Sequence, residues 1–167
     1  MAQLKKREEI IKETVSSGGF LVQMYFDIHG KEKDVLQNVM IDLIGKITGE
    51  KGVADAIGKI EEPIQAGDEE MFSTSAQVQI AAKNLATLFR IVSHYSPIGV
   101  EIIQPHDPKI SLGELQGVLM DVAIMSNEFS TFAMKRLLKP EEVDDLNRQI
   151  KAREKIGKHL REKTEKG

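Results

Sequence analysis

The order of apolar and polar residues changes from a helical to a strand pattern near residue 20. Residues 3–15 place Leu4, Ile11 and Val15 near one side of a helix that is otherwise rich in Lys and Glu. The small residues at 16–19 end this amphipathic leader helix. Apolar residues then occupy every second position from 20 to 29, which predicts a strand with one apolar and one polar face.

Strand and helix patterns alternate through the following 75 residues, between segment ends marked by Gly and Pro. Helical spacing predicts helices near 31–48 and from 85 to a point before Pro97. Further strands are predicted at 56–62, 72–80 and 98–104, and the segment 67–70 is predicted to be a turn. The region 18–105 is therefore predicted to form a βαββαβ core.

A βαββαβ order resembles a ferredoxin-like sandwich, in which two helices cover one face of an antiparallel sheet. The fold class that we predict is α+β, with an N-terminal helix and two C-terminal helices added to this core. Residues 111–114, Ser-Leu-Gly-Glu, fit a capping box that starts a long helix reaching about Lys139. Pro140 suits the start of a last helix in the C-terminal region 111–162, and one domain is expected over 1–167.

Composition limits the class of protein more than it identifies one. Hydrophobic residues make up 41% of the 167 and charged residues 29%, as in ordinary water-soluble proteins. No apolar run is long enough to cross a bilayer and no secretory signal is present, so we expect a cytoplasmic protein without a membrane partner. The chain has no cysteine, which excludes disulfides and thiolate zinc sites.

The polar face of the predicted sheet is the first place where chemistry could reside. Alternation puts Tyr25, Asp27 and His29 on the face opposite the apolar row, where an Asp–His pair could orient an imidazole for acid/base work. The same face is predicted to carry Lys59, Glu61, Ser73, Ser75, Gln77, Gln79 and Glu101. Such a surface could bind a small polar ligand or another sheet. It could equally be solvated, or covered by the 111–138 helix.

A second His–Asp pair, His106 and Asp107, lies between two prolines in the loop before the long helix. A rigid loop can present such residues to a ligand, although Asp beside Pro is also common in turns. None of the four histidines has the short spacing typical of metal ligands, so no metal site is predicted, and no cofactor is assigned.

Three functions remain open at this level. Familiar nucleotide-binding and hydrolase motifs are absent, so whether the protein is an enzyme stays uncertain. The favoured hypothesis is a non-enzymatic binding or assembly module that forms a homo-oligomer, because the stripe over 112–137 is more apolar helix surface than one small sheet needs. The alternatives are a small enzyme near Asp27 and His29, and nucleic-acid binding by the basic C-terminal helix. A nucleic-acid partner is disfavoured because the net charge is −3 and the tail lacks aromatic residues.

Overall fold

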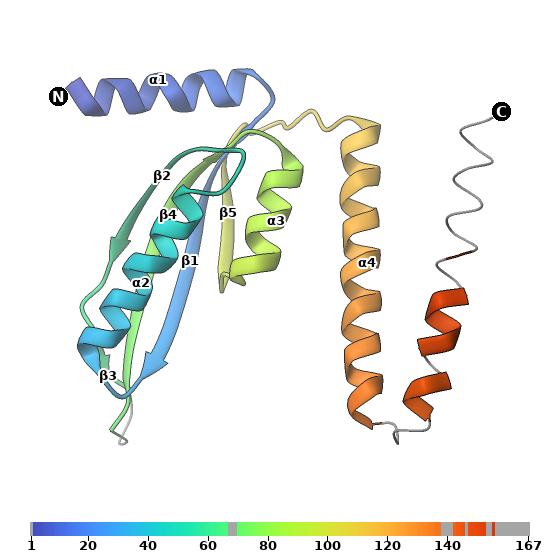
Figure 1. The fold of residues 1–167 in the computed structure, drawn as a ribbon. Coiled ribbons are helices and arrows are strands. Elements are labelled where there is room, and N and C mark those ends of the chain that lie inside the picture. Colours follow the sequence, from blue (N-terminus) through green and yellow to red (C-terminus); the bar gives the residue numbers. More distant parts are fainter. Residues whose placement is uncertain (1, 67–69, 138–141, 146, 153–154, 156–167) are drawn as a thin grey trace. The chain divides into compact units, whose positions relative to one another are not determined.

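A computed structural model describes residues 2–66, 70–137, 142–145, 147–152 and 155, with side chains from residue 5 onwards (Figure 1). Contacts divide the chain into an N-terminal unit, residues 1–118, and a C-terminal unit, residues 119–167. The boundary falls inside the helix α4 (Leu112–Leu137). The expectation of one domain over 1–167 stays a prediction.

The alternating segments form one antiparallel sheet in the N-terminal unit. Its strands are β1 (Phe20–Gly30), β2 (Val53–Ile60), β3 (Ile64–Gln65), β4 (Phe72–Ala82) and β5 (Gly99–Gln104). The order is β2-β4-β1-β5, and the short strand β3 pairs with β4. Because β1 pairs with both β4 and β5, the two longest strands lie at the centre of the sheet. The predicted α+β class with an antiparallel sheet is confirmed.

The apolar face of this sheet packs against the helices α2 (Lys33–Thr48) and α3 (Leu85–Tyr95). Every second residue of β1 from Phe20 to Phe26 is buried, as are Met40 and Ile47 of α2 and Ile91 of α3. Deep burial of this kind is the main source of stability in a domain of this size. The core of the N-terminal unit therefore lies between the sheet and these two helices.

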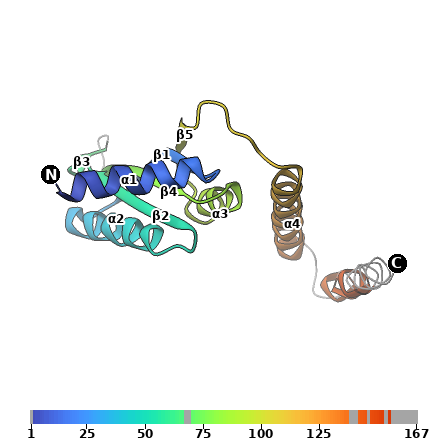
Figure 2. The same cartoon turned by 90° about the horizontal axis from the view of Figure 1, so that it is seen from above.

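The helix α1 (Ala2–Ser16) lies on the opposite face of the sheet from α2 and α3 (Figure 2). It contacts β1, β2 and β4, and its Thr14 is buried. Leu21, on the polar face of β1, is also buried. The sequence left open whether this face is solvated or covered by the 111–138 helix; in the N-terminal unit, α1 covers part of it.

The β2 segment differs from its predicted range, 56–62. Strand β2 begins at Val53, directly after Gly52, whose φ of 93° is a left-handed conformation that favours glycine. The Gly52 carbonyl also accepts a hydrogen bond from the Lys83 amide at 2.9 Å, which ties the turn to the end of β4. Beyond Pro63 the chain pairs with β4 again as β3, which the sequence did not predict. Residues 67–69 of the predicted turn lie outside the described residues.

The capping box that starts α4 is confirmed. The Glu114 amide donates to the Ser111 Oγ at 3.2 Å, and the Glu114 carboxylate accepts from the Ser111 amide at 3.2 Å. The predicted end of this helix and the start of the last one, residues 138–141, lie outside the described residues. Residues 142–145 and 147–152 are helical. Within the described ranges, no helix is long and apolar enough to cross a membrane.

Candidate functional site

The polar side chains of β1, β2 and β4 line up in rows across the sheet. Tyr25 lies opposite Gln77, which in turn lies opposite Lys59 on β2. Asp27 lies opposite Ser75 in the next row. The strand pairing therefore places these polar side chains side by side on the face that alternation predicted.

Asp27 connects two other polar residues at the end of β1. Its Oδ1 accepts a hydrogen bond from the Ser73 Oγ at 2.8 Å, and its Oδ2 lies 3.2 Å from the His29 Nε2. His29 is exposed, whereas Asp27 and Ser73 are partly buried. The sequence predicted the Asp–His pair, while Ser73, 46 residues away, joins it through strand pairing.

This arrangement can orient an imidazole, but it does not activate a serine. In a nucleophilic relay the histidine accepts the serine proton and the carboxylate holds the far side of the ring. Here the carboxylate lies between the serine and the histidine. A neighbouring hollow of about 590 Å³ is lined by Ser73, Ser75, Glu61 and apolar residues of β2 and β3. The local chemistry suits hydrogen bonding to a small polar molecule better than covalent catalysis.

Arg7 of α1 occupies the other end of the polar face. Its Nε lies 2.8 Å from the Asp55 Oδ2 and its Nη2 donates to the Gln79 Oε1 at 2.7 Å. All three side chains are partly buried, which favours a specific contact over a solvated one. The sequence did not single out Arg7, because nothing in a Lys-rich helix indicates which of its basic residues contacts the sheet.

The loop pair His106 and Asp107 lies at the opposite end of the sheet from Asp27 and His29. It follows Gln104, which pairs with Leu21 at the start of β1, whereas His29 is near the end of that strand. Both residues are exposed, and Asp107 borders a small hollow with the end of α1. The two candidate pairs therefore do not form one site.

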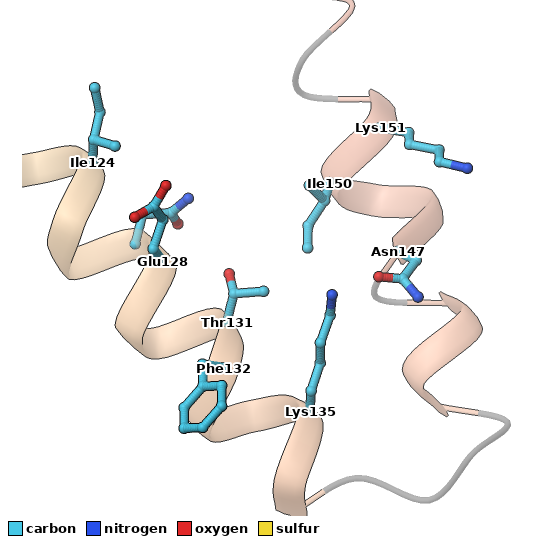
Figure 3. A pocket seen from close by; sticks show the side chains of 9 residues that line it. Ile124, Glu128, Thr131, Phe132, Lys135, Asn147, Ile150 and Lys151 are labelled. Carbon is cyan, nitrogen blue, oxygen red and sulfur yellow. The ribbon is translucent and has the colours of Figure 1, made fainter.

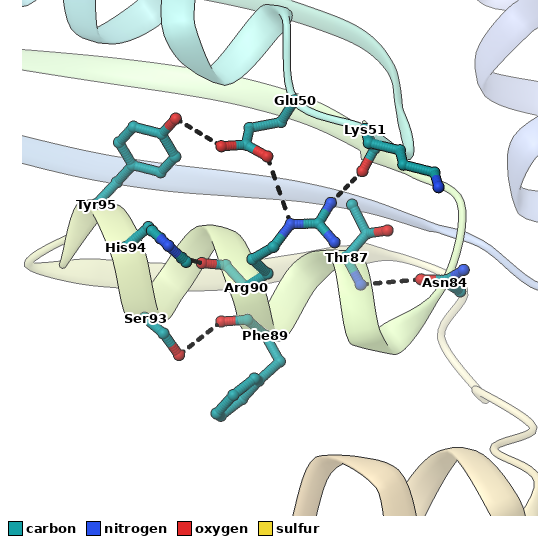
Figure 4. A network of polar contacts seen from close by, with 9 residues as sticks. All are labelled: Glu50, Lys51, Asn84, Thr87, Phe89, Arg90, Ser93, His94 and Tyr95. Carbon is teal, nitrogen blue, oxygen red and sulfur yellow. Dashed lines mark hydrogen bonds and ion pairs between the residues drawn. The ribbon is translucent and has the colours of Figure 1, made fainter. Parts of the chain in front are cut away.

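A polar network links the end of α3 to the loop after α2 (Figure 4). The Tyr95 hydroxyl donates to the Glu50 Oε1 at 2.8 Å, and the Arg90 Nε lies 3.4 Å from the Glu50 Oε2. Arg90 also donates to the carbonyl of Lys51. Burial raises the pKa of Tyr95 above the ordinary 10.0, as do the hydrogen bond to the Glu50 carboxylate and the negative charge of that group. This network holds the end of α3 to the loop after α2.

The helix α4 differs from α2 and α3, which both bury apolar residues against the sheet. All 26 of its residues are described, and none of its side chains is buried. Five of its large apolar residues recur at spacings of three, four or seven residues along one side of the helix. This apolar stripe comprises Leu112, Leu115, Leu119, Val122 and Phe129, all of them exposed.

Within the C-terminal unit, α4 and the helical residues 147–152 border a cavity of about 560 Å³ (Figure 3). Ile124, Thr131 and Lys135 line it from α4, and Ile150 extends toward them. None of the apolar stripe residues lines this cavity. Within this unit, the helical residues 147–152 therefore border another side of α4 than the stripe.

Metal-binding residues do not gather in the part of the chain that the structure describes. No group of three or more His, Asp or Glu there is placed to hold an ion. The Asp27 carboxylate and His29 imidazole form a pair only.

The fold and these surfaces define an α+β protein with a helical C-terminal region. The chain belongs to the MJ0538 family, whose family model matches residues 21–161. The match begins in β1, runs through the whole of α4 and reaches the last helix, while α1 precedes it. No curated protein and no solved structure matches the chain.

Proposed function

We propose that this protein is an assembly module that forms a homo-oligomer through the apolar stripe of α4. The single observation that carries the proposal is that a 26-residue helix rich in Leu, Val, Met and Phe buries none of them. Apolar surface of this extent is typical of protein–protein contacts in water. A helix that is apolar over most of its circumference is normally buried.

The available free energy is of the size that association requires. Complete burial of one Leu, Val or Phe side chain is worth about 1.5–3 kcal/mol. Partial burial of the stripe residues from two copies can therefore offset the roughly 4–15 kcal/mol that association costs. A second copy is always present at the concentration of the first, which favours self-association.

Two neighbouring substitutions test this proposal. Leu119 and Met120 have side chains of similar size that are 61% and 56% exposed, yet they point to different sides of α4. Leu119→Glu places a charge in the stripe of every copy, so the dissociation constant should rise by at least about 100-fold. Met120→Glu should change the dissociation constant by less than about tenfold relative to the unmodified protein.

Sedimentation velocity over a range of micromolar concentrations measures both effects, with circular dichroism as the control for folding. Dissociation by Leu119→Glu alone supports assembly through the stripe. Equal sedimentation of the unmodified protein and both variants as monomers would overturn the proposal.

A second proposal, binding of a small polar ligand, rests on the contact between Asp27, His29 and Ser73. A thermal-shift screen of metabolites against the full chain, repeated on His29→Ala and Asp27→Asn, tests it. A ligand that stabilises the unmodified protein but neither variant supports the site. If every ligand affects all three proteins equally, the proposal fails.

The finer description of the core as a ferredoxin-like sandwich is also a proposal. It is supported by the order β2-β4-β1-β5 and by the packing of α2 and α3 on one face. An experimental structure that keeps this order and both crossovers would establish it. The expected cytoplasmic location likewise stays a prediction.

A further inference from the structure

The charged residues of α4 are confined to one side for most of its length. Glu114, Asp121, Glu128 and Lys135 recur every seven residues, away from the apolar stripe. The line of the stripe continues through Ser126 and Ala133 to Arg136. A helix surface without charge from 112 to 133 is the kind of seam along which two helices pack.

The sizes of the residues along this line favour one direction of pairing. In an antiparallel pair centred near residue 124, Leu119 lies opposite Phe129 of the second copy and Leu115 opposite its Ala133. Val122 then lies opposite Ser126. Two of these three layers combine a larger with a smaller side chain, which suits efficient packing.

Residues that flank the stripe fit the same arrangement. Val118 lies beside Phe132 of the second copy, and Met125 beside its own counterpart. All three are apolar, and Met125 is exposed in the single chain. One edge of the seam is therefore apolar along its whole length.

Charge also distinguishes the two directions. In a parallel pair, Arg136 lies against Arg136 of the second copy, and the acidic halves of the two helices run side by side. In the antiparallel pair, Arg136 lies opposite Leu112 of the second copy, two positions from its Glu114, although Asp121 lies almost level with Glu128. Opposite charges and opposed helix dipoles both favour the antiparallel pair.

We infer that two copies of this chain associate about a two-fold axis, with their α4 helices antiparallel and centred near Ile124. The inference rests on the proposed assembly function and specifies the partner surface and its orientation. Such a contact is isologous, so it closes as a dimer.

Because the chain has no cysteine, two single substitutions report the orientation directly. In the antiparallel pair, residue 115 lies opposite residue 133, and each lies about 27 Å from its own counterpart. Leu115→Cys and Ala133→Cys, each alone, should form almost no intermolecular disulfide under mild oxidation. After the two variants are mixed, unfolded and refolded together, they should form a covalent heterodimer, because a disulfide needs Cα atoms about 4.4–6.8 Å apart.

The outcomes separate this inference from the proposed function. Efficient disulfide formation by Ala133→Cys alone indicates a parallel pair and overturns the inference only. A dimer in sedimentation with no disulfide in any sample places the contact elsewhere, which also overturns the inference. A monomer in every sample removes both the inference and the proposed function.

Discussion

The helices α2 and α4 follow similar apolar patterns but differ in what they pack against. Leu36, Met40 and Ile47 of α2 are buried beneath the sheet. Phe129 of α4 is 70% exposed, and its neighbours along the stripe are exposed as well. An amphipathic pattern thus predicts a helix and its apolar side without revealing whether the partner is the same chain or another.

The largest expected change in the free energy of unfolding comes from substituting a buried apolar residue, compared with an exposed one. Ile80 lies fully buried at the centre of the sheet, so Ile80→Ala should lower the free energy of unfolding by about 2–5 kcal/mol. Phe129→Ala should change it by less than about 0.5 kcal/mol when the protein is dilute enough to be monomeric. Urea denaturation of both variants provides the measurement. An equal loss in the two would show that α4 is packed within a single chain.

The N-terminal caps of α3 and α4 allow the packed and the exposed helix to be compared through a smaller effect. The Asn84 Oδ1 accepts from the Thr87 amide at 2.9 Å at the start of the packed helix α3. Asn84→Ala should therefore lower the stability of the core by about 0.5–2 kcal/mol. Ser111→Ala removes the cap of α4 and should leave the core transition in place while it reduces helicity. Thermal unfolding followed by circular dichroism measures both, and a shift of the core transition by Ser111→Ala would contradict the comparison.

The Tyr95 network predicts a dependence on alkaline pH. The pKa of Tyr95 is raised in the folded state, so the folded chain retains this proton more strongly than the unfolded chain. The resulting stabilisation is complete below pH 10 and is lost as the pH rises through the raised pKa. Tyr95→Phe should lower the free energy of unfolding by about 0.5–1.5 kcal/mol at pH 7, because the hydrogen bond to Glu50 is lost. The variant should also lack the decrease in stability above pH 10 that ionisation of Tyr95 causes.

Denaturation midpoints between pH 7 and 11 would measure that difference. Tyr25→Phe serves as the control, since its hydroxyl makes only a long, exposed contact of 3.4 Å with Glu101. If Tyr95→Phe and the unmodified protein lose the same stability above pH 10, the pKa of Tyr95 is not raised in the folded state.

The smallest effect concerns the charges at the ends of α4. Arg136 lies over the Phe132 ring, with its Cζ 4.7 Å from the ring centroid, and in the proposed pair it would lie two positions from Glu114 of a second copy. Arg136→Glu should weaken the dimer by about 0.2–1 kcal/mol, and adding Glu114→Arg should restore it. Sedimentation at low salt measures the change. If the double variant dimerises more weakly than Arg136→Glu alone, the antiparallel direction is wrong.

Much of the secondary structure could be predicted because its signals are local. The alternation in β1 and β4, the helical spacing of α2 and the capping box at Ser111 each depend on residues close in sequence. The strand β3 was missed because two residues after a proline carry no periodicity, and they pair only because β4 extends past β2.

The contacts at the candidate sites depend on residues far apart in the chain, so local patterns cannot reveal them. Ser73 reaches Asp27 across 46 positions, and Arg7 reaches Gln79 across 72. The link between Tyr95 and Glu50 is of the same kind. Alternation placed Asp27 and His29 on one face, but only strand register determines what lies beside them.

Assembly through α4 is tested by sedimentation equilibrium of the unmodified 167-residue chain over concentrations from about 1 μM to about 100 μM. The measured mass should rise with concentration and level off at twice that of one chain, because an isologous contact closes as a dimer. A mass that stays at one chain throughout this range would contradict it.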